Sequence, residues 1–202
     1  SGRIAEWLEA PYDAPTIAEV KKMIVAGNAS ELTDAFYKDL EFGTGGLRGV
    51  LGVGTNRMNN FTVGKATQGL SNYLKKNYPD EQIKIAVSYD SRHQSAEFSR
   101  LIADIFVANG CEVFLFESLR PTPQLSFAIR QLGCHSGVMV TASHNPKEYN
   151  GYKAYWRDGG QLVAPHDRGV IAEVLAIKDP GQVLWASESV DSGVGGRLHL
   201  LG

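Results

Sequence analysis

The side chains with the clearest chemical potential lie in one stretch, Gly137–Lys153, which reads GVMVTASHNPKEYNGYK. Its apolar, β-branched beginning, residues 137–140, predicts a short buried strand. Asn145-Pro146 then turns the chain, because proline donates no backbone N–H and disfavours helix at the residue before it. Ser143 is therefore expected at the carboxyl end of a strand, where open α/β sheets bind their ligands.

Ser143 is accompanied by three side chains that are or can become cationic: His144, Lys147 and Lys153. A hydroxyl in such surroundings can help to bind an anion or can act as a nucleophile. A plain turn is the structural alternative, because these residue types are common in loops. The stretch is not a hydrolase elbow, since Thr141 and Asn145 stand where G-x-S-x-G requires glycine.

A second stretch, residues 43–54, holds six glycines and one arginine, Arg48. Glycine lets backbone N–H groups approach a phosphate closely, and the planar guanidinium of arginine can bind phosphate oxygens at two points. The stretch is no P-loop, because no Gly-Lys-Ser/Thr follows. It also lacks the third glycine and the preceding strand of a Rossmann fingerprint. A glycine-rich turn with one exposed arginine remains the alternative.

Composition limits the class of protein. The 202 residues are 43% hydrophobic and 21% charged, which indicates one globular domain with a substantial core. The formal net charge of −2 offers no basic excess for nucleic acid or for an anionic membrane. No signal peptide is recognisable, and no apolar run approaches the roughly 18–20 residues that span a bilayer. Cys111 and Cys134 have no metal-type or redox-type spacing, so we expect reduced core residues in a cytoplasmic protein.

The elements that position these residues follow from periodicity and turn signals. Residues 4–42 are expected to be helical, with a capping box at Thr16–Glu19, and to pack on the outside of the domain. Beyond them, strands are predicted at 83–89, 113–116 and 137–142, and helices at 62–77, 95–109, 122–132 and 165–177. The turn that contains Asp90 and Arg92 is expected to cap a helix and to form a salt bridge.

Strand–helix units of this spacing predict right-handed crossovers and a mainly parallel sheet. Residues 152–156 and 161–163, joined at Asp158-Gly159, predict a hairpin that makes one edge antiparallel. The expected fold is therefore a three-layer α/β/α domain with a mixed, mainly parallel sheet, preceded by a helical extension. The less periodic tail, 179–202, is compatible with a strand pair or with a domain boundary.

Two motifs together resemble a known family. T-A-S-H-N-P followed by Y-N-G-Y-K resembles the phosphoserine loop of the α-D-phosphohexomutases, the phosphoglucomutase/phosphomannomutase superfamily, and G-T-G-G-L-R-G at residues 43–49 stands at that family's spacing. The resemblance covers residues 41–178. It implies a helical extension at 1–42, domain I at 43–202, and domains II–IV of the parent chain as partners that this sequence does not contain.

The resemblance implies transfer of phosphate between C1 and C6 of a hexose phosphate, through a phosphoserine at Ser143 and a sugar bisphosphate. Arg48, Gly45, Ser143 and Lys153 are the implied substrate contacts, and His144 and Lys153 share the acid and base roles. Mg²⁺ is the implied cofactor, held here only by the Ser143 phosphate oxygen, because the family's D-x-D-x-D-R type motif does not occur in this sequence. Glucose 1,6-bisphosphate is the implied activator.

Several alternatives stay open. Within the superfamily, a phosphopentomutase or a glucose 1,6-bisphosphate synthase remains an alternative, because residues of the third domain mainly distinguish the sugars. A non-catalytic sugar-phosphate binding module is disfavoured by the intact Ser143, His144 and Lys153. A nucleotide-binding domain is disfavoured by the missing fingerprints. The 202 residues by themselves are expected to fold but not to turn over sugar phosphate.

Overall fold

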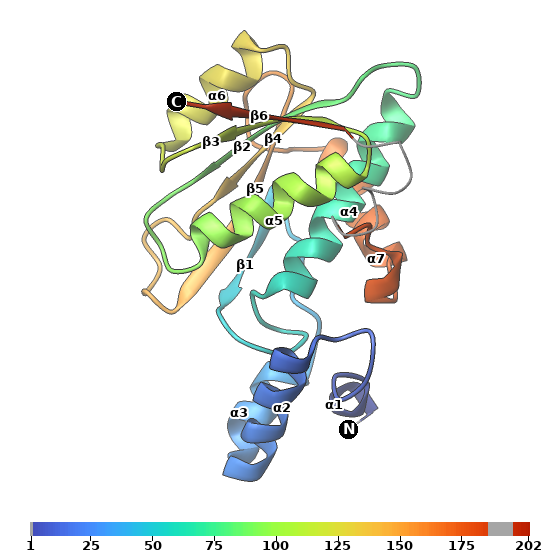
Figure 1. The fold of residues 1–202 in the computed structure, drawn as a ribbon, viewed down its shortest axis with the longest axis vertical. Helices are drawn as coiled ribbons and strands as arrows, with labels where there is room; N and C mark the ends of the chain where they lie inside the picture. The colour runs from blue at the N-terminus through green and yellow to red at the C-terminus, as the bar shows by residue number, and fades with distance from the viewer. Residues whose placement is uncertain (1, 186–195) are drawn as a thin grey trace.

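The computed structural model describes residues 2–185 and 196–202, which build one six-stranded mixed sheet with helices on both faces (Figure 1). The strands are ordered β1 (Gly46–Val50), β5 (Tyr149–Trp156), β4 (Ser136–Val140), β2 (Lys84–Tyr89), β3 (Glu112–Phe116) and β6 (Arg197–Leu201). β4, β2, β3 and β6 pair in parallel, whereas β5 is antiparallel to both of its neighbours. The predicted three-layer α/β/α fold with a mainly parallel sheet is confirmed.

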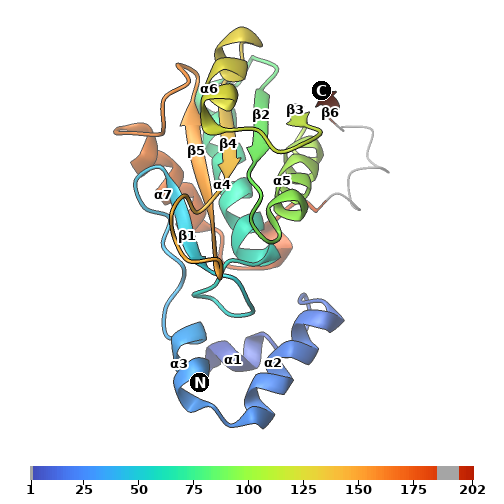
Figure 2. The same ribbon diagram turned by 90° about the vertical axis from the view of Figure 1, so that its left-hand side faces the viewer.

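The two faces of the sheet are covered unequally. Helices α4 (Asn60–Asn77), α5 (Ser95–Ala108) and α7 (His166–Ala176) pack together on one face. Helix α6 (Thr122–Gln131) packs on β2 and β4 from the other side (Figure 2). Because α6 does not extend over β1, Arg48 is exposed on that strand. None of the helices in the described parts of the chain is long and apolar enough to cross a membrane.

Both cysteines lie in the core and neither forms a disulfide. Burial raises the pKa of the Cys111 thiol to about 11 and that of Cys134 to about 12. At neutral pH both side chains are therefore protonated thiols, which are poor nucleophiles and poor metal ligands.

Two helix starts differ from the sequence prediction in the same way. Helix α2 (Ala14–Ala26) is capped by Asp13, whose Oδ1 accepts from the Thr16 N–H at 2.8 Å. Helix α4 is capped by Asn59, while the Thr62 hydroxyl oxygen accepts from the Asn59 N–H at 3.1 Å. The capping box expected at Thr16–Glu19 and the helix start expected at residue 62 are therefore both wrong. Asp and Asn are stronger caps than Thr, so each helix begins earlier.

The strands near the glycine-rich stretch also differ. A turn was the alternative expected there, whereas residues 46–50 form strand β1 against β5. β5 begins at Tyr149 and not at residue 152, and the predicted hairpin shrinks to one bridge, Tyr155 with Gln161. Of the predicted tail, residues 186–195 lie outside the described residues, and the remainder contributes a 3₁₀ turn, Pro180–Gln182, and β6.

The N-terminal extension consists of three helices, α1 (Gly2–Glu6), α2 and α3 (Ala29–Phe36), which form the lower lobe of Figures 1 and 2. Trp7, which is 2% exposed, is its centre. The indole stacks on Tyr12 at 4.4 Å between ring centroids and meets the edge of Phe61, in the first turn of α4, at 5.7 Å. This aromatic cluster fastens the extension to the α/β domain, so that the extension lies outside the sheet as expected.

Replacing the indole of Trp7 is expected to weaken the packing of the extension and to lower the free energy of unfolding. Trp7→Ala leaves a large buried cavity, which typically costs about 3–5 kcal/mol. Urea unfolding followed by circular dichroism measures the change, and Tyr37→Ala is a matched control because Tyr37 is 57% exposed. Equal stability of the two variants would show that Trp7 does not fasten the extension.

Candidate active site

Ser143 lies three residues beyond Val140, where β4 ends, and its side chain is exposed. Its backbone is left-handed, with φ of 55°, a conformation that costs a non-glycine residue roughly 1–3 kcal/mol. Two hydrogen bonds hold this turn: the Ser143 N–H donates to Thr141 Oγ1 at 2.9 Å, and the Asn145 N–H donates to the Ala142 carbonyl at 3.1 Å. A strained backbone at an exposed hydroxyl is typical of a group that meets a ligand.

Arg48 comes to this loop from a distant part of the sequence. In β1 it stands opposite Gly151, and its Nη1 donates to Asn145 Oδ1 at 2.7 Å. Gly46 permits the close pairing of β1 with β5, because a Cβ there would overlap the Tyr152 carbonyl oxygen. The structure thus brings Arg48 to the loop of residues 143–149, here called the Ser143 loop, and its contact with substrate stays a prediction.

Lys153 lies on β5, opposite Gly46 of β1 and Met139 of β4. Side chains at alternate positions of a strand share a face, so Lys153 is on the same face as residue 151 and therefore as Arg48. Diagonal positions on paired strands have Cα atoms about 7–8 Å apart, which long side chains can bridge. Within residues 2–185 and 196–202, neither Arg48 nor Lys153 forms an ion pair with a carboxylate. Both charges are available to an anion.

The geometry gives less direct support to the predicted roles of two other site residues, His144 and Gly45. His144 is exposed, and its Nδ1 is 3.4 Å from Ser143 Oγ, a long and weak hydrogen bond. Gly45 is buried with φ of 80°, and its carbonyl accepts from the Ala154 N–H at 2.8 Å. Gly45 therefore has a structural role between β1 and β5, and its contact with substrate stays a prediction.

Arg92 is the residue whose role the sequence did not reveal. The expected pair with Asp90 is present, with 3.7 Å between Nε and Oδ2, and Asp90 also accepts from the Ser95 hydroxyl at the start of α5. The guanidinium, however, is directed mainly at backbone carbonyls of the Ser143 loop. The D-x-R turn at the carboxyl end of β2, which is adjacent to β4, was the available signal.

The described residues gather cationic groups around Ser143 but form no complete cation site. The Ser143 loop is contacted by a histidine and two arginines, and the Asn145 amide oxygen is already bound to Arg48. In the described part of the chain, no three His, Cys, Asp or Glu side chains are grouped to hold a metal ion. A phosphate on Ser143 fits this surrounding, whereas Mg²⁺ would need ligands from elsewhere.

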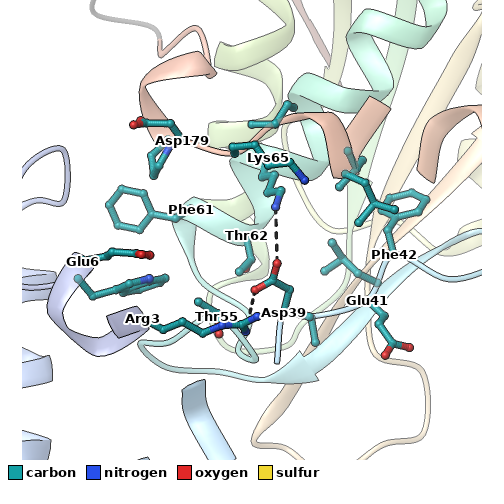
Figure 3. A pocket seen from close by; sticks show the side chains of 18 of the residues that line it. Arg3, Glu6, Asp39, Glu41, Phe42, Thr55, Phe61, Thr62, Lys65 and Asp179 are labelled. Atoms are coloured by element: carbon teal, nitrogen blue, oxygen red, sulfur yellow. Dashed lines mark hydrogen bonds and ion pairs between the residues drawn. The ribbon is translucent and has the colours of Figure 1, made fainter. Parts of the chain in front are cut away.

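A large pocket lies behind β1, away from this chemistry (Figure 3). It encloses about 470 Å³ between the extension, α4 and α7, and Leu47, which precedes Arg48 in β1, lines it. Asp39 bridges Arg3 at 3.1 Å and Lys65 at 4.0 Å beside it. Desolvation lowers the pKa of Lys65, and the neighbouring Asp39 opposes that shift. None of the predicted site residues lines this pocket, because successive strand residues face opposite sides and Arg48 therefore faces away from it.

Comparison with known proteins places this geometry in a family. Residues 39–180 match the family model of the phosphoglucomutase/phosphomannomutase α/β/α domain I. Human phosphopentomutase is 40% identical over 195 residues, and human glucose 1,6-bisphosphate synthase is 35% identical over 196; the alignments cover 93% and 94% of this chain and 32% of each relative. The chain therefore spans about a third of their length.

A crystal structure of a putative phosphomannomutase from Thermus thermophilus has the same fold, with a TM-score of 0.66 and 27% identity over 81% of this chain and 33% of that one. The motifs, the topology and the family match agree, and the chain belongs to the phosphoglucomutase/phosphomannomutase family, of which it contains domain I.

Proposed function

We propose that this chain is the phosphoserine domain of a sugar-phosphate mutase. The observation that carries the proposal is the exposed, left-handed Ser143 at the end of β4, with Arg48 and Lys153 on one face of the adjoining strands. Cationic side chains without carboxylate partners beside a hydroxyl suit a group that holds phosphate. The net charge of −2 supplies no general attraction for phosphate, so these local charges must provide it.

In the proposed reaction, a hydroxyl of the sugar phosphate attacks the phosphorus of phosphorylated Ser143. The bond from phosphorus to the sugar oxygen forms as the bond to Ser143 Oγ breaks, and the sugar hydroxyl gives its proton to a base. Ser143 Oγ takes up a proton from an acid, and the bisphosphate then returns its other phosphate to the serine by the reverse steps. His144 and Lys153 are the candidates for the two proton transfers, which typically contribute about 10²–10⁴-fold to the rate.

Arg48 and Lys153 have a second task in this proposal. In-line phosphoryl transfer needs positioning and compensation of charge on the phosphoryl oxygens. Arg48 already contacts Asn145 in the loop with one N–H, which leaves donors of its guanidinium for a phosphate on Ser143. Mg²⁺ is part of the proposed holoenzyme only with outside ligands, because the Ser143 phosphate oxygen is the ligand that we assign to this chain.

The proposal has a second part, which is the identity of the sugar phosphate that serves as substrate. Transfer between C1 and C6 of a hexose phosphate, with glucose 1,6-bisphosphate as activator, is the reaction that we propose, and the match to the phosphoglucomutase/phosphomannomutase family model supports it. Transfer on a pentose phosphate is supported by the 40% identity to human phosphopentomutase, and a glucose 1,6-bisphosphate synthase by the 35% identity to that relative. Turnover by the full-length protein of glucose 1-phosphate, mannose 1-phosphate and ribose 1-phosphate, measured side by side, distinguishes them.

Phosphorylation is expected on Ser143. Full-length protein incubated with glucose 1,6-bisphosphate, and separately with ribose 1,5-bisphosphate, should carry one phosphate on the peptide that contains Ser143 by mass spectrometry. Ser143→Ala should lose it, and Ser30→Ala, which removes an exposed serine of α3, should retain it. Phosphate found only on another residue would contradict the assignment, and no phosphate with any bisphosphate would favour a binding module.

Arg48→Lys is expected to lower kcat/KM of the full-length enzyme by about ten- to a hundredfold. Lysine keeps the charge but loses the two-point fork, and one hydrogen bond to a charged group is worth about 1.5–3 kcal/mol. Arg130→Lys on the exposed surface of α6 is the matched control. Wild-type kinetics in Arg48→Lys would show that Arg48 only supports the strand.

The 202 residues alone are expected to fold and to be inactive. Their two core layers lie on either side of the sheet, which supports independent folding. The charges that would hold Mg²⁺ are not grouped in the described residues, and phosphoryl transfer depends on such charges. A coupled mutase assay on the purified chain, with circular dichroism to verify folding, tests this. Turnover above that of the Ser143→Ala variant would show that the site is complete here.

A further inference from the structure

The guanidinium of Arg92 is inserted among the backbone carbonyls of the Ser143 loop. Nη2 donates to the carbonyls of Ser143 at 2.8 Å and Asn145 at 2.6 Å. Nη1 donates to those of Pro146 at 2.9 Å and Tyr149 at 3.0 Å. The side chain of Arg92 is only 14% exposed, and its hydrogen bonds to the Tyr149 and Asn145 carbonyls are partly buried. One side chain thus binds the loop from its beginning to the first residue of β5.

The terminal donors of Arg92 are fully engaged. A guanidinium has five N–H groups; the four on Nη1 and Nη2 donate to carbonyl oxygens, and the fifth, on Nε, lies in an ion pair with Asp90 Oδ2 at 3.7 Å. Neither terminal nitrogen has a donor left for a phosphate. Arg48 has the opposite character, because its guanidinium is exposed and its side-chain hydrogen bond within the described residues goes to one amide oxygen. The two arginines that contact the loop therefore have different tasks.

A network of hydrogen bonds around Asp90 keeps Arg92 in place. Asp90 Oδ1 accepts from the Arg92 N–H at 3.0 Å and from the Ser95 hydroxyl at 2.9 Å. Ser95 Oγ in turn accepts from Asn150 Nδ2 at 3.0 Å, and Asn150 also donates to the His93 carbonyl at 2.9 Å. The turn after β2 is thereby joined to the start of β5, where the Ser143 loop ends.

We infer that Arg92 is a positioning residue of the phosphoryl transfer, which fixes Ser143 in its left-handed backbone and contacts neither phosphate nor sugar. The inference deepens the proposed function and rests on it. Four carbonyl dipoles turned toward one point would repel one another without a cation between them. Withdrawing the fork would let residues 143–149 relax, and Ser143 would leave the strained conformation that aims its Oγ.

Arg92→Lys separates positioning from substrate contact. A lysine ammonium has three donors on a flexible stem and cannot bind four carbonyls and a carboxylate together. We expect kcat of the full-length enzyme to fall about a hundredfold, since a displacement of about 1 Å can cost that much, while KM for the sugar phosphate changes little. Arg100→Lys on α5, where the exposed arginine pairs with Asp104, should match wild type. A rise in KM with unchanged kcat would overturn the inference.

Amide hydrogen exchange in residues 143–149 tests the same contacts without substrate. Faster exchange in Arg92→Lys than in Arg100→Lys supports the inference, and equal exchange overturns it. This readout is independent of the proposed function, which fails separately if wild-type Ser143 is never phosphorylated. As a second variant, Arg92→Ala should regain phosphorylation of Ser143 when millimolar guanidinium is added and not with sodium at the same ionic strength. Equal rates in both salts would overturn the inference.

Discussion

The insertion of β5 between β4 and β1 is the constraint on which the rest of the site depends. Its antiparallel register places Gly151 opposite Arg48 and Lys153 opposite Gly46, so that two cations lie on one face beside the loop that leaves β4. Glycine at 46 is needed because β1 approaches β5 so closely that a side chain would overlap backbone. The antiparallel strand also lets the Ser143 loop be short, which keeps Ser143 and Lys153 in one structural unit.

The cationic side chains of the site have different roles, which depend on the groups that each of them faces. Arg48 and Lys153 have no carboxylate partner in the described residues, and a protein with net charge −2 needs such local cations to attract a phosphate. Arg92 carries the same charge but directs it at carbonyl oxygens, which shape the loop. Residue type alone does not distinguish these roles. The distinction comes from the donors that remain after the protein's own acceptors are satisfied.

The two faces of β1 have separate surroundings. Arg48 faces the open side near the Ser143 loop, and Leu47 faces the pocket that the N-terminal helices close. The extension is held there by the aromatic cluster of Trp7, Tyr12 and Phe61, and by Asp39 between Arg3 and Lys65. The ion pairs are mostly exposed and contribute little to stability, so the aromatic cluster, in which Trp7 is buried and Tyr12 and Phe61 are partly buried, mainly holds the extension.

The sequence by itself determined the local elements and the central loop. Periodicity indicated β2, β3, β4 and the four helices of the domain, and Asn145-Pro146 ended the strand before the loop, because these signals depend on neighbouring residues. The family motifs singled out Ser143, His144, Lys153 and Arg48. Only the tertiary structure showed that residues 46–50 form a strand and that Arg92 binds the loop. Both depend on partners far along the chain: β1 needs β5, and Arg92 lies 51 residues before Ser143, whose carbonyl it binds. A glycine-rich segment has weak strand propensity, and pairing with a distant strand decides its conformation.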